Sequence, residues 1–374
     1  MQASFLNMHD ASSGSGVYPE PEERLVWLDL LKVVSAFAVV MTHIASIGWQ
    51  VIAPSDEGWF VTSVYEIVTR FAVPAFFMTS GALLLNPRRK LGLRRVLMGY
   101  LPKTAFLALF VSLLFCVLQS ILYGWQGWRF VILGTLDGPY FIWYLWVLVG
   151  LYALTPPLRL ISARPDALGY SVVLLAVFVM GRSTADAMLP GSALTVFLDN
   201  FILFSSGMEG VFYYLLGAWL ISHPIRGGRG WAVVLVGGLS VLLAIFLNYR
   251  DALANGQDLY YVARDNALIA LFSVGVWEAF YLIFSKVSGC RALDYLVRWG
   301  MTIYLSHPFF RLAMEGIAQF RLAVDWLLSA PLVSIPVVSV LIWIMSACFA
   351  GALGLVRNAI IRPPLLREPE DDDR

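Results

Sequence analysis

The chain has 374 residues, of which 59% are hydrophobic and only 14% are charged, and its mean hydropathy is +0.74. This composition excludes an ordinary soluble globule and indicates an integral membrane protein. The net charge is only +1 and no basic patch is interleaved with aromatic residues, so the sequence predicts no nucleic-acid partner.

Polar segments flank the apolar part of the chain. Residues 1–24 contain an SSGSG tract and lack the basic region and cleavage site of a signal peptide, which predicts a disordered, retained tail. Residues 358–374 end in EPEDDDR and predict a solvated acidic tail. Three scattered cysteines without C-x-x-C spacing predict no disulfide framework and no structural zinc or other metal site.

Ten apolar stretches lie between these tails, and most are long enough to span a bilayer. The sequence therefore predicts an all-α, polytopic membrane helix bundle of about ten transmembrane helices within residues 25–357. The stretches cover residues 25–48, 59–85, 96–122, 139–160, 167–189, 208–222, 231–248, 266–286, 298–319 and 331–356.

The charges of the connecting loops predict the orientation of the bundle. Lysine and arginine accumulate in the cytoplasmic loops of membrane proteins. The loop after the second stretch holds five of them within residues 88–95, and the later even-numbered loops hold two each. The odd-numbered loops hold two at most. Both termini are therefore expected to be cytoplasmic.

The first stretch carries three polar groups on one side. At about 100° per residue, Lys32 and His43 point within about 20° of the same direction, and Asp29 lies between about 40° and 60° from each. Lys32 and His43 are roughly 16 Å apart along the helix, in the inner half and near the outer end. Such groups usually face protein or a wet cavity, so the stripe is a functional candidate, with helix packing as the alternative.

The second stretch combines an ion pair with a helix breaker. Glu66 and Arg70 are four residues apart, the spacing of a helical ion pair that reduces the insertion cost of both. Pro74 predicts a kink. The small residues Ser80 and Gly81 beyond it allow a backbone or a ligand to approach closely.

Later stretches add weaker candidates. Lys103 either snorkels to phosphate headgroups or points inward at an anionic ligand. His307, Arg311 and Glu315 share one helix face, as site groups or as a structural polar ladder. These features fit a membrane enzyme, or alternatively a transporter or flippase of a glycan precursor or small anionic solute.

Several motifs resemble the acyltransferase 3 family, ten-helix bacterial membrane enzymes that modify cell-surface glycans. WLDLLKVVSAFAVVMTH, residues 27–43, has the family's aromatic residue, Leu-Asp, a basic residue and a histidine eleven positions later. RFAVPAFFMTSG, residues 70–81, has its Arg, Val-Pro and Ser-Gly. The patterns of the family's fourth, sixth and ninth helices resemble residues 143–158, 213–220 and 302–310.

Two positions depart from the family pattern. Lys32 stands where the family usually has arginine. Lysine keeps the positive charge but lacks the planar guanidinium that can bind a ligand through two hydrogen bonds. Phe141 stands where many members have a histidine just before the fourth-helix tryptophan. This removes one candidate and puts any role for that position in doubt.

The resemblance implies transfer of an acyl group, first of all acetyl, from cytoplasmic acyl-coenzyme A to a hydroxyl of an extracytoplasmic glycan or lipid-linked sugar. It also implies a bacterial inner membrane, with polysaccharide-assembly proteins as candidate partners. His43 is the expected general base, with its transient acylation as the second route.

Other roles follow from the same resemblance. Arg70, and second Ser80, are expected to stabilise the negative thioester oxygen. Asp29 is expected to orient or neutralise Lys32. Lys32 and Lys103 are the candidates for binding the coenzyme. Further candidate site residues are Tyr304, His307 and Trp143.

Overall fold

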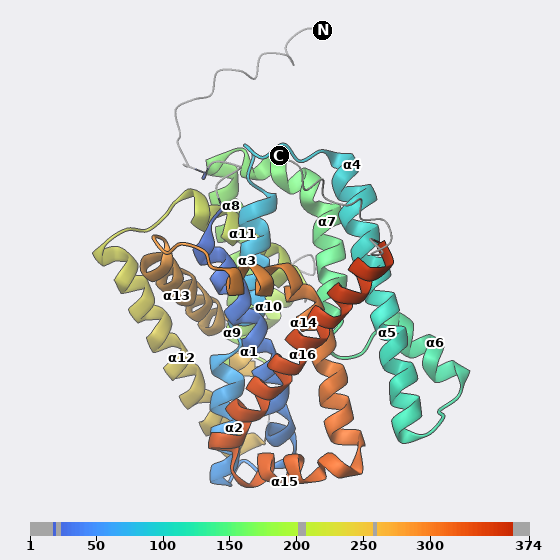
Figure 1. Ribbon diagram of the computed structural model, residues 1–374. Coiled ribbons are helices and arrows are strands. Elements are labelled where there is room, and N and C mark those ends of the chain that lie inside the picture. Colours follow the sequence, from blue (N-terminus) through green and yellow to red (C-terminus); the bar gives the residue numbers. More distant parts are fainter. Residues whose placement is uncertain (1–17, 20–23, 201–206, 257–259, 362–374) are drawn as a thin grey trace, which may run out of the picture.

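The computed structural model describes residues 18–19, 24–200, 207–256 and 260–361, and within these ranges it contains helices and no strands (Figure 1). Eight helical segments are long and apolar enough to cross a membrane, so the predicted polytopic helix bundle is confirmed. They are Val26–Val51, Glu57–Leu84, Leu93–Tyr123, Trp143–Ser162, Pro165–Met188, Gly228–Asn255, Ala267–Phe284 and Pro331–Arg357.

The two other predicted spans are also helical, but they differ from these eight. Helix α11 (Met208–Ser222) is apolar but has only 15 residues, and α14 (Arg291–Gly316) is long but carries several charges. The total of ten transmembrane helices and the cytoplasmic location of both termini therefore remain predictions. Most of the predicted tails lie outside the described residues, although α16 (Pro331–Ile361) extends to 361, and Tyr18 is buried with its hydroxyl donating to the Ser162 carbonyl.

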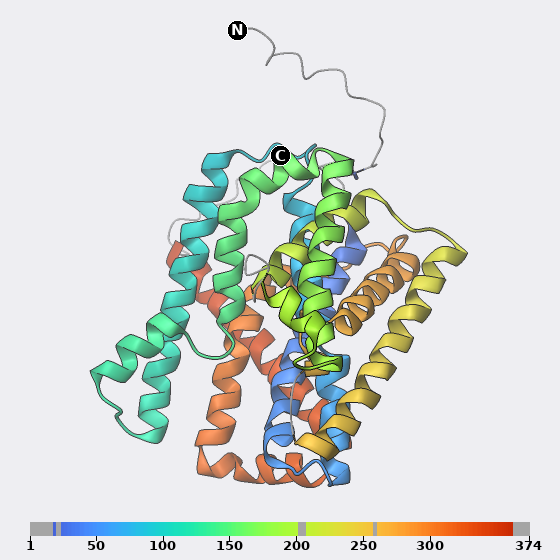
Figure 2. The ribbon, with the colours of Figure 1, turned by 180° about the vertical axis from the view of Figure 1, so that it is seen from behind.

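Helix α1 (Val26–Val51) lies at the centre of the bundle and contacts α2, α3, α13, α14 and α16. Seen from the front and from behind, α5 and α6 lie on one side and α12 and α13 on the other (Figures 1 and 2). The remaining helices are α2 (Glu57–Val68), α3 (Ala72–Leu84), α4 (Leu93–Arg95), α5 (Leu101–Tyr123), α6 (Trp128–Asp137), α7 (Trp143–Ser162), α8 (Pro165–Leu175), α9 (Gly181–Met188), α10 (Ala193–Asp199), α12 (Gly228–Asn255), α13 (Ala267–Phe284) and α15 (Arg321–Ser329).

The predicted kink near Pro74 is a complete break between two helices. Proline has no backbone N–H, so it cannot bond the carbonyl of Arg70 four residues earlier. Helix α2 accordingly ends at Val68 and α3 begins at Ala72, with a turn between them. The break places Arg70 at a helix junction, where its largely buried side chain pairs with Glu66 on α2.

Helices α3 and α11 cross at backbone contact. A Cβ atom added to Gly81 would lie 1.8 Å from the carbonyl oxygen of Tyr214, and one added to Gly217 would lie 1.9 Å from that of Met78. Small residues allow such close approach between membrane helices. The close approach predicted at Ser80 and Gly81 is therefore confirmed, and a backbone rather than a ligand fills the space at Gly81.

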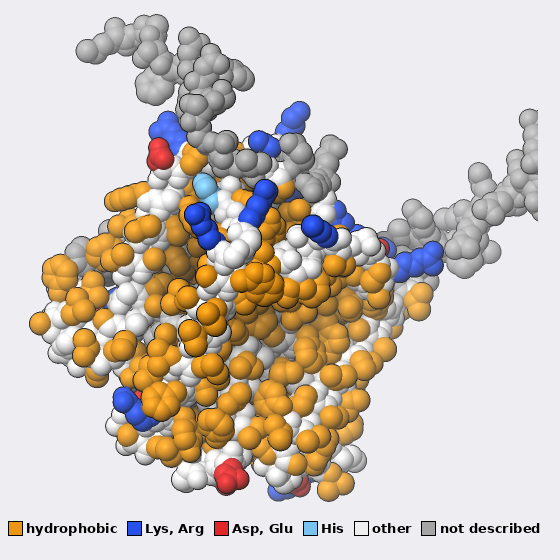
Figure 3. All heavy atoms as spheres, turned by 90° about the vertical axis from the view of Figure 1, so that its left-hand side faces the viewer, with side chains coloured by type: hydrophobic (Ala, Val, Ile, Leu, Met, Phe, Trp, Pro, Cys, Tyr) orange, Lys and Arg blue, Asp and Glu red, His pale blue; other side chains and the backbone are white. Residues whose placement is uncertain are grey.

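The surface shows one polarised end. Basic side chains gather at the end where α1 begins, above a broad hydrophobic band (Figure 3). The connections that follow α3, α7 and α11 carry basic residues, in agreement with the loop pattern of the sequence. This end is the predicted cytoplasmic side.

Candidate active site

The stripe predicted on α1 faces α14 along its whole length. Lys32 lies beside the first half of α14, where both line one cavity, and the ring of His43 stacks on that of His307 with centroids 5.3 Å apart. Eleven residues of helix separate the two polar groups by roughly 16 Å. The structure therefore contains two polar regions, one at each end of a shared helix contact.

His43 lies in a cluster of aromatic and cationic side chains. Its ring meets Tyr140 edge to face at 5.1 Å, and the Arg311 guanidinium lies 5.2 Å from the Tyr140 ring. Arg311 also donates to the Ser46 hydroxyl, at 3.2 Å, and pairs with a glutamate one turn later on α14. The His43 nitrogens form no hydrogen bond with any described residue and are available to an incoming hydroxyl.

His307 is held in one tautomer. Its Nδ1 lies within hydrogen-bond distance of the Tyr304 carbonyl oxygen, which can only accept, so Nδ1 carries the proton. Nε2 is buried without a partner among the described residues. The ring of His307 stacks on that of His43 and lies beside Tyr304, which lines the cavity.

Two arginines lie near this cluster. Arg70 pairs with Glu66, as the spacing predicted, and interacts electrostatically with His43. Arg264 stacks on Trp143 with its Cζ atom 3.8 Å from the ring centroid. Burial lowers the pKa of the Arg264 guanidinium, and the positive charge of Arg70 lowers it further. The cluster therefore contains three arginines, of which Arg70 and Arg311 are paired with carboxylates.

Arg264 is a site residue that the sequence analysis missed, because it counted only as a charge in an odd-numbered loop. The Tyr213 hydroxyl holds its backbone carbonyl at 2.6 Å, and its buried Nε has no partner among the described residues. An arginine in loops otherwise almost free of cations, three residues before a span, was the available signal.

Breaking the buried pair between Arg70 and Glu66 is expected to destabilise the protein. Arg70→Gln leaves the Glu66 carboxylate buried without its counter-charge, which typically costs about 3 to 5 kcal/mol. We expect a lower midpoint of thermal unfolding for this variant than for the double variant with Glu66→Gln. A double variant as unstable as Arg70→Gln alone would contradict this account of the pair.

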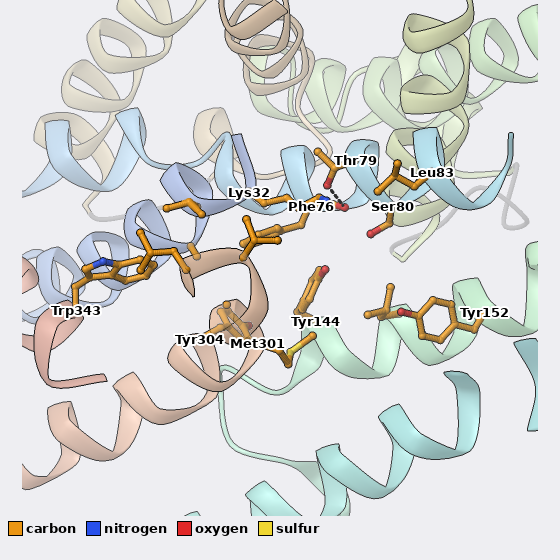
Figure 4. Close-up of a pocket in the computed structure, with 16 residues that line it drawn as sticks. Lys32, Phe76, Thr79, Ser80, Leu83, Tyr144, Tyr152, Met301, Tyr304 and Trp343 are labelled. Carbon is orange, nitrogen blue, oxygen red and sulfur yellow. Dashed lines mark hydrogen bonds between the residues drawn. The ribbon is translucent and has the colours of Figure 1, made fainter. Parts of the chain in front are cut away.

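The second polar region is a cavity of about 210 Å³ around Lys32 (Figure 4). Ser80, Tyr144 and Tyr304 face it, and most of the other lining side chains are apolar. Ser80 is ten residues beyond Arg70, or about 15 Å of helix, so the structure does not bring these two candidates together. Ser80 lies in the cavity with Lys32, and Arg70 lies in the region of His43.

Lys32 is one member of an ionic chain at the mouth of this cavity. Its Nζ lies 3.2 Å from Asp29, whose other oxygen accepts from Arg24 at 2.8 Å. Arg24 also pairs with Asp294 on α14, at 2.6 Å. Asp29 therefore holds Lys32 as expected, while it shares its charge with Arg24, a residue of the predicted tail.

Tyr304 links the two regions. It lines the cavity, its hydroxyl donates to the Phe141 carbonyl at 3.0 Å, and its ring lies 5.7 Å from that of His307. Phe141 itself is fully buried, so this side chain serves packing. Lys103, in contrast, is exposed on α5 and does not line the cavity.

Fold and site together define a polytopic helical membrane protein with a centre that contains arginines and histidines and lies beside a largely apolar cavity. A family model described as an acyltransferase domain matches residues 25–353, nearly the whole chain. The chain therefore belongs to the acyltransferase 3 family and is a membrane acyltransferase. No curated protein and no solved structure shows a match to the chain.

Proposed function

We propose that the protein transfers an acyl group, acetyl in the first instance, from acyl-coenzyme A to a hydroxyl of an extracytoplasmic glycan or lipid-linked sugar in a bacterial inner membrane. The observation that carries this proposal is a row of side chains in contact. Tyr304 lines the cavity around Lys32, its ring lies against His307, and His307 stacks on His43. This arrangement connects the basic end of the bundle with a histidine about 16 Å deeper along α1.

The donor is proposed to enter from the basic end. Lys32 and the basic loops suit the phosphates of coenzyme A, and the apolar walls of the cavity suit the pantetheine arm and a short acyl chain. Tyr144 and Tyr304 also line the cavity. The thioester would then arrive beside His307 and His43. Lys103 remains a separate prediction for coenzyme binding.

His43 is the proposed general base. It removes the proton of the acceptor hydroxyl as that oxygen attacks the thioester carbonyl, and the C–S bond then breaks to release coenzyme A, whose sulfur receives the proton. Negative charge develops on the carbonyl oxygen during the attack. Arg70 is the proposed donor to that oxygen, because it already interacts with His43.

The Lys32 side chain is expected to contribute to donor affinity. Lys32→Gln keeps the length of the side chain approximately but removes its charge, so the KM for acetyl-coenzyme A should rise about two- to tenfold. Kinetics of acyl transfer in purified membranes measure this change. Lys286→Gln, which alters an exposed lysine after α13, is the matched control and should leave KM unchanged. Equal KM values for all three proteins would remove Lys32 from the donor site.

A transporter and an acyltransferase differ in whether the solute is chemically changed. Transport predicts that an intact solute crosses the membrane without forming an ester or amide, and that its movement survives loss of His43. Formation of an acylated glycan that depends on His43 is the result expected for the proposed enzyme.

A further inference from the structure

A second cavity of about 220 Å³ lies between α1, α11 and α13. It shares no lining residue with the cavity around Lys32. Trp27, which lines it, and Lys32 are five residues apart on α1, so their side chains point about 140° away from each other. This cavity is therefore separate from the candidate active site, and the proposed reaction does not use it.

A buried carboxylate without a partner forms part of its wall. Glu278 on α13 is only 1% exposed, and its Oε2 atom has no hydrogen-bond partner among the described residues. The described part of the chain also places no cation in ion-pair contact with it. A buried polar group of this kind normally has a partner, so the carboxylate offers an unfilled position for a donor or cation.

Aromatic rings surround this carboxylate. Trp27 meets Trp277 edge to face at 5.0 Å and Tyr281 at 5.5 Å, and all three line the same cavity as Glu278. Aromatic faces attract cations through their quadrupoles, and a carboxylate adds a charge-assisted hydrogen bond. Rings combined with an unpaired carboxylate recognise an ammonium group and repel an anion.

The rim of the cavity carries the opposite charge. Arg226 lines it from the connection between α11 and α12 and is exposed. This connection lies at the end where basic side chains gather above the hydrophobic band (Figure 3). Glu278 and Arg226 line one cavity and therefore present a carboxylate and a guanidinium to the same ligand.

We propose that this cavity binds a ligand that carries an ammonium group next to a phosphate. The ammonium binds Glu278 between Trp27 and Tyr281, and the phosphate binds Arg226. An ethanolamine phospholipid headgroup and free phosphoethanolamine both have this chemistry. Because Trp27 precedes Lys32 on α1, occupancy would fix the start of the helix that carries the candidate active site.

The test is lipid binding to the purified full-length chain in detergent, followed by native mass spectrometry. Wild-type protein is titrated with phosphatidylethanolamine and with phosphatidylglycerol, which has the phosphate but no ammonium. We expect phosphatidylethanolamine to bind about tenfold more tightly, the usual worth of a charge-assisted hydrogen bond. Glu278→Gln should abolish this difference, and Glu57→Gln, at an exposed carboxylate, should preserve it.

A second variant and a competition experiment complete the test. Tyr281→Leu should reduce the preference as well, and it replaces Glu278→Gln if that variant does not fold. If soluble phosphoethanolamine competes with the bound lipid, the free compound is identified as the ligand. If it does not compete, the lipid is identified as the ligand. Equal binding of both lipids to wild type, or a preference that survives Glu278→Gln, would overturn the proposal. Acyl transfer is not read out here, so this result is independent of the proposed function.

Discussion

Replacing His43 with alanine is expected to reduce acyl transfer by about 10²- to 10⁴-fold while the protein remains folded in the membrane. General-base catalysis by one positioned side chain has this magnitude. The His43 nitrogens are free of hydrogen bonds to described residues, and the ring is held in place by stacking on His307. Loss of the imidazole therefore removes the proton acceptor and leaves the α1–α14 contact largely intact. Rates of acetyl transfer in membranes with matched protein amounts measure the effect.

The appropriate control is another histidine of the same chain. His223→Ala alters a partly exposed ring that stacks on Trp219 at the end of α11 and is expected to leave the rate unchanged. His307→Ala is informative as well, because it removes the stack but keeps the proposed base, and a smaller loss is expected. A His43→Ala enzyme that transfers acyl groups at the wild-type rate would exclude the general-base role.

Replacing Gly81 with alanine is expected to impair folding more than most single substitutions in this protein. The added methyl group would lie 1.8 Å from the Tyr214 carbonyl oxygen, and a backbone atom cannot turn away as a side chain can. Helices α3 and α11 must therefore separate, and overpacking of this kind costs about 1 to 3 kcal/mol or more. Activity should fall too, because α3 carries Ser80 and follows directly after Arg70. The yield of monodisperse protein and its thermal unfolding midpoint measure the loss.

Gly238→Ala provides the matched control. Gly238 lies in the interior of α12, and a Cβ atom added there meets nothing within 4 Å. Alanine is the better helix former, so this variant should be as stable as wild type or slightly more stable. If Gly81→Ala behaves like Gly238→Ala, the tight crossing of α3 and α11 does not exist in the membrane.

Local periodicity explains which features the sequence could predict. The bundle of apolar helices, the stripe of Lys32 and His43, and the pair of Glu66 and Arg70 all depend on local residue spacing. The structure contains eight candidate spans, the stripe and the pair. Gly81 was also recognisable, because small residues in a membrane helix mark close contact. The sequence could not decide between a ligand and a backbone as its neighbour, which depends on α11.

The features that sequence reasoning missed depend on contacts between distant segments. His43 and His307 were separate candidates, and only the packing of α1 on α14 makes them a stack. Arg264 counted as a loop charge until the fold placed it on Trp143, more than a hundred residues earlier. Arg70 was the first candidate and Ser80 the second for stabilising one oxygen, whereas Ser80 lines the cavity around Lys32 and Arg70 does not. No periodic pattern encodes such long-range contacts.

The most direct test of the proposed reaction uses membrane vesicles whose cytoplasmic face is outward, supplied with acetyl-coenzyme A labelled in the acetyl group. The account predicts that label appears in lipid-linked or polymeric glycan inside the vesicles when wild-type protein is present, and is nearly absent with His43→Ala. Label in the glycan fraction at equal levels with both proteins would contradict His43 as the base. Failure of any acyl-coenzyme A to label glycan through the wild-type protein would contradict the proposed donor and acceptor.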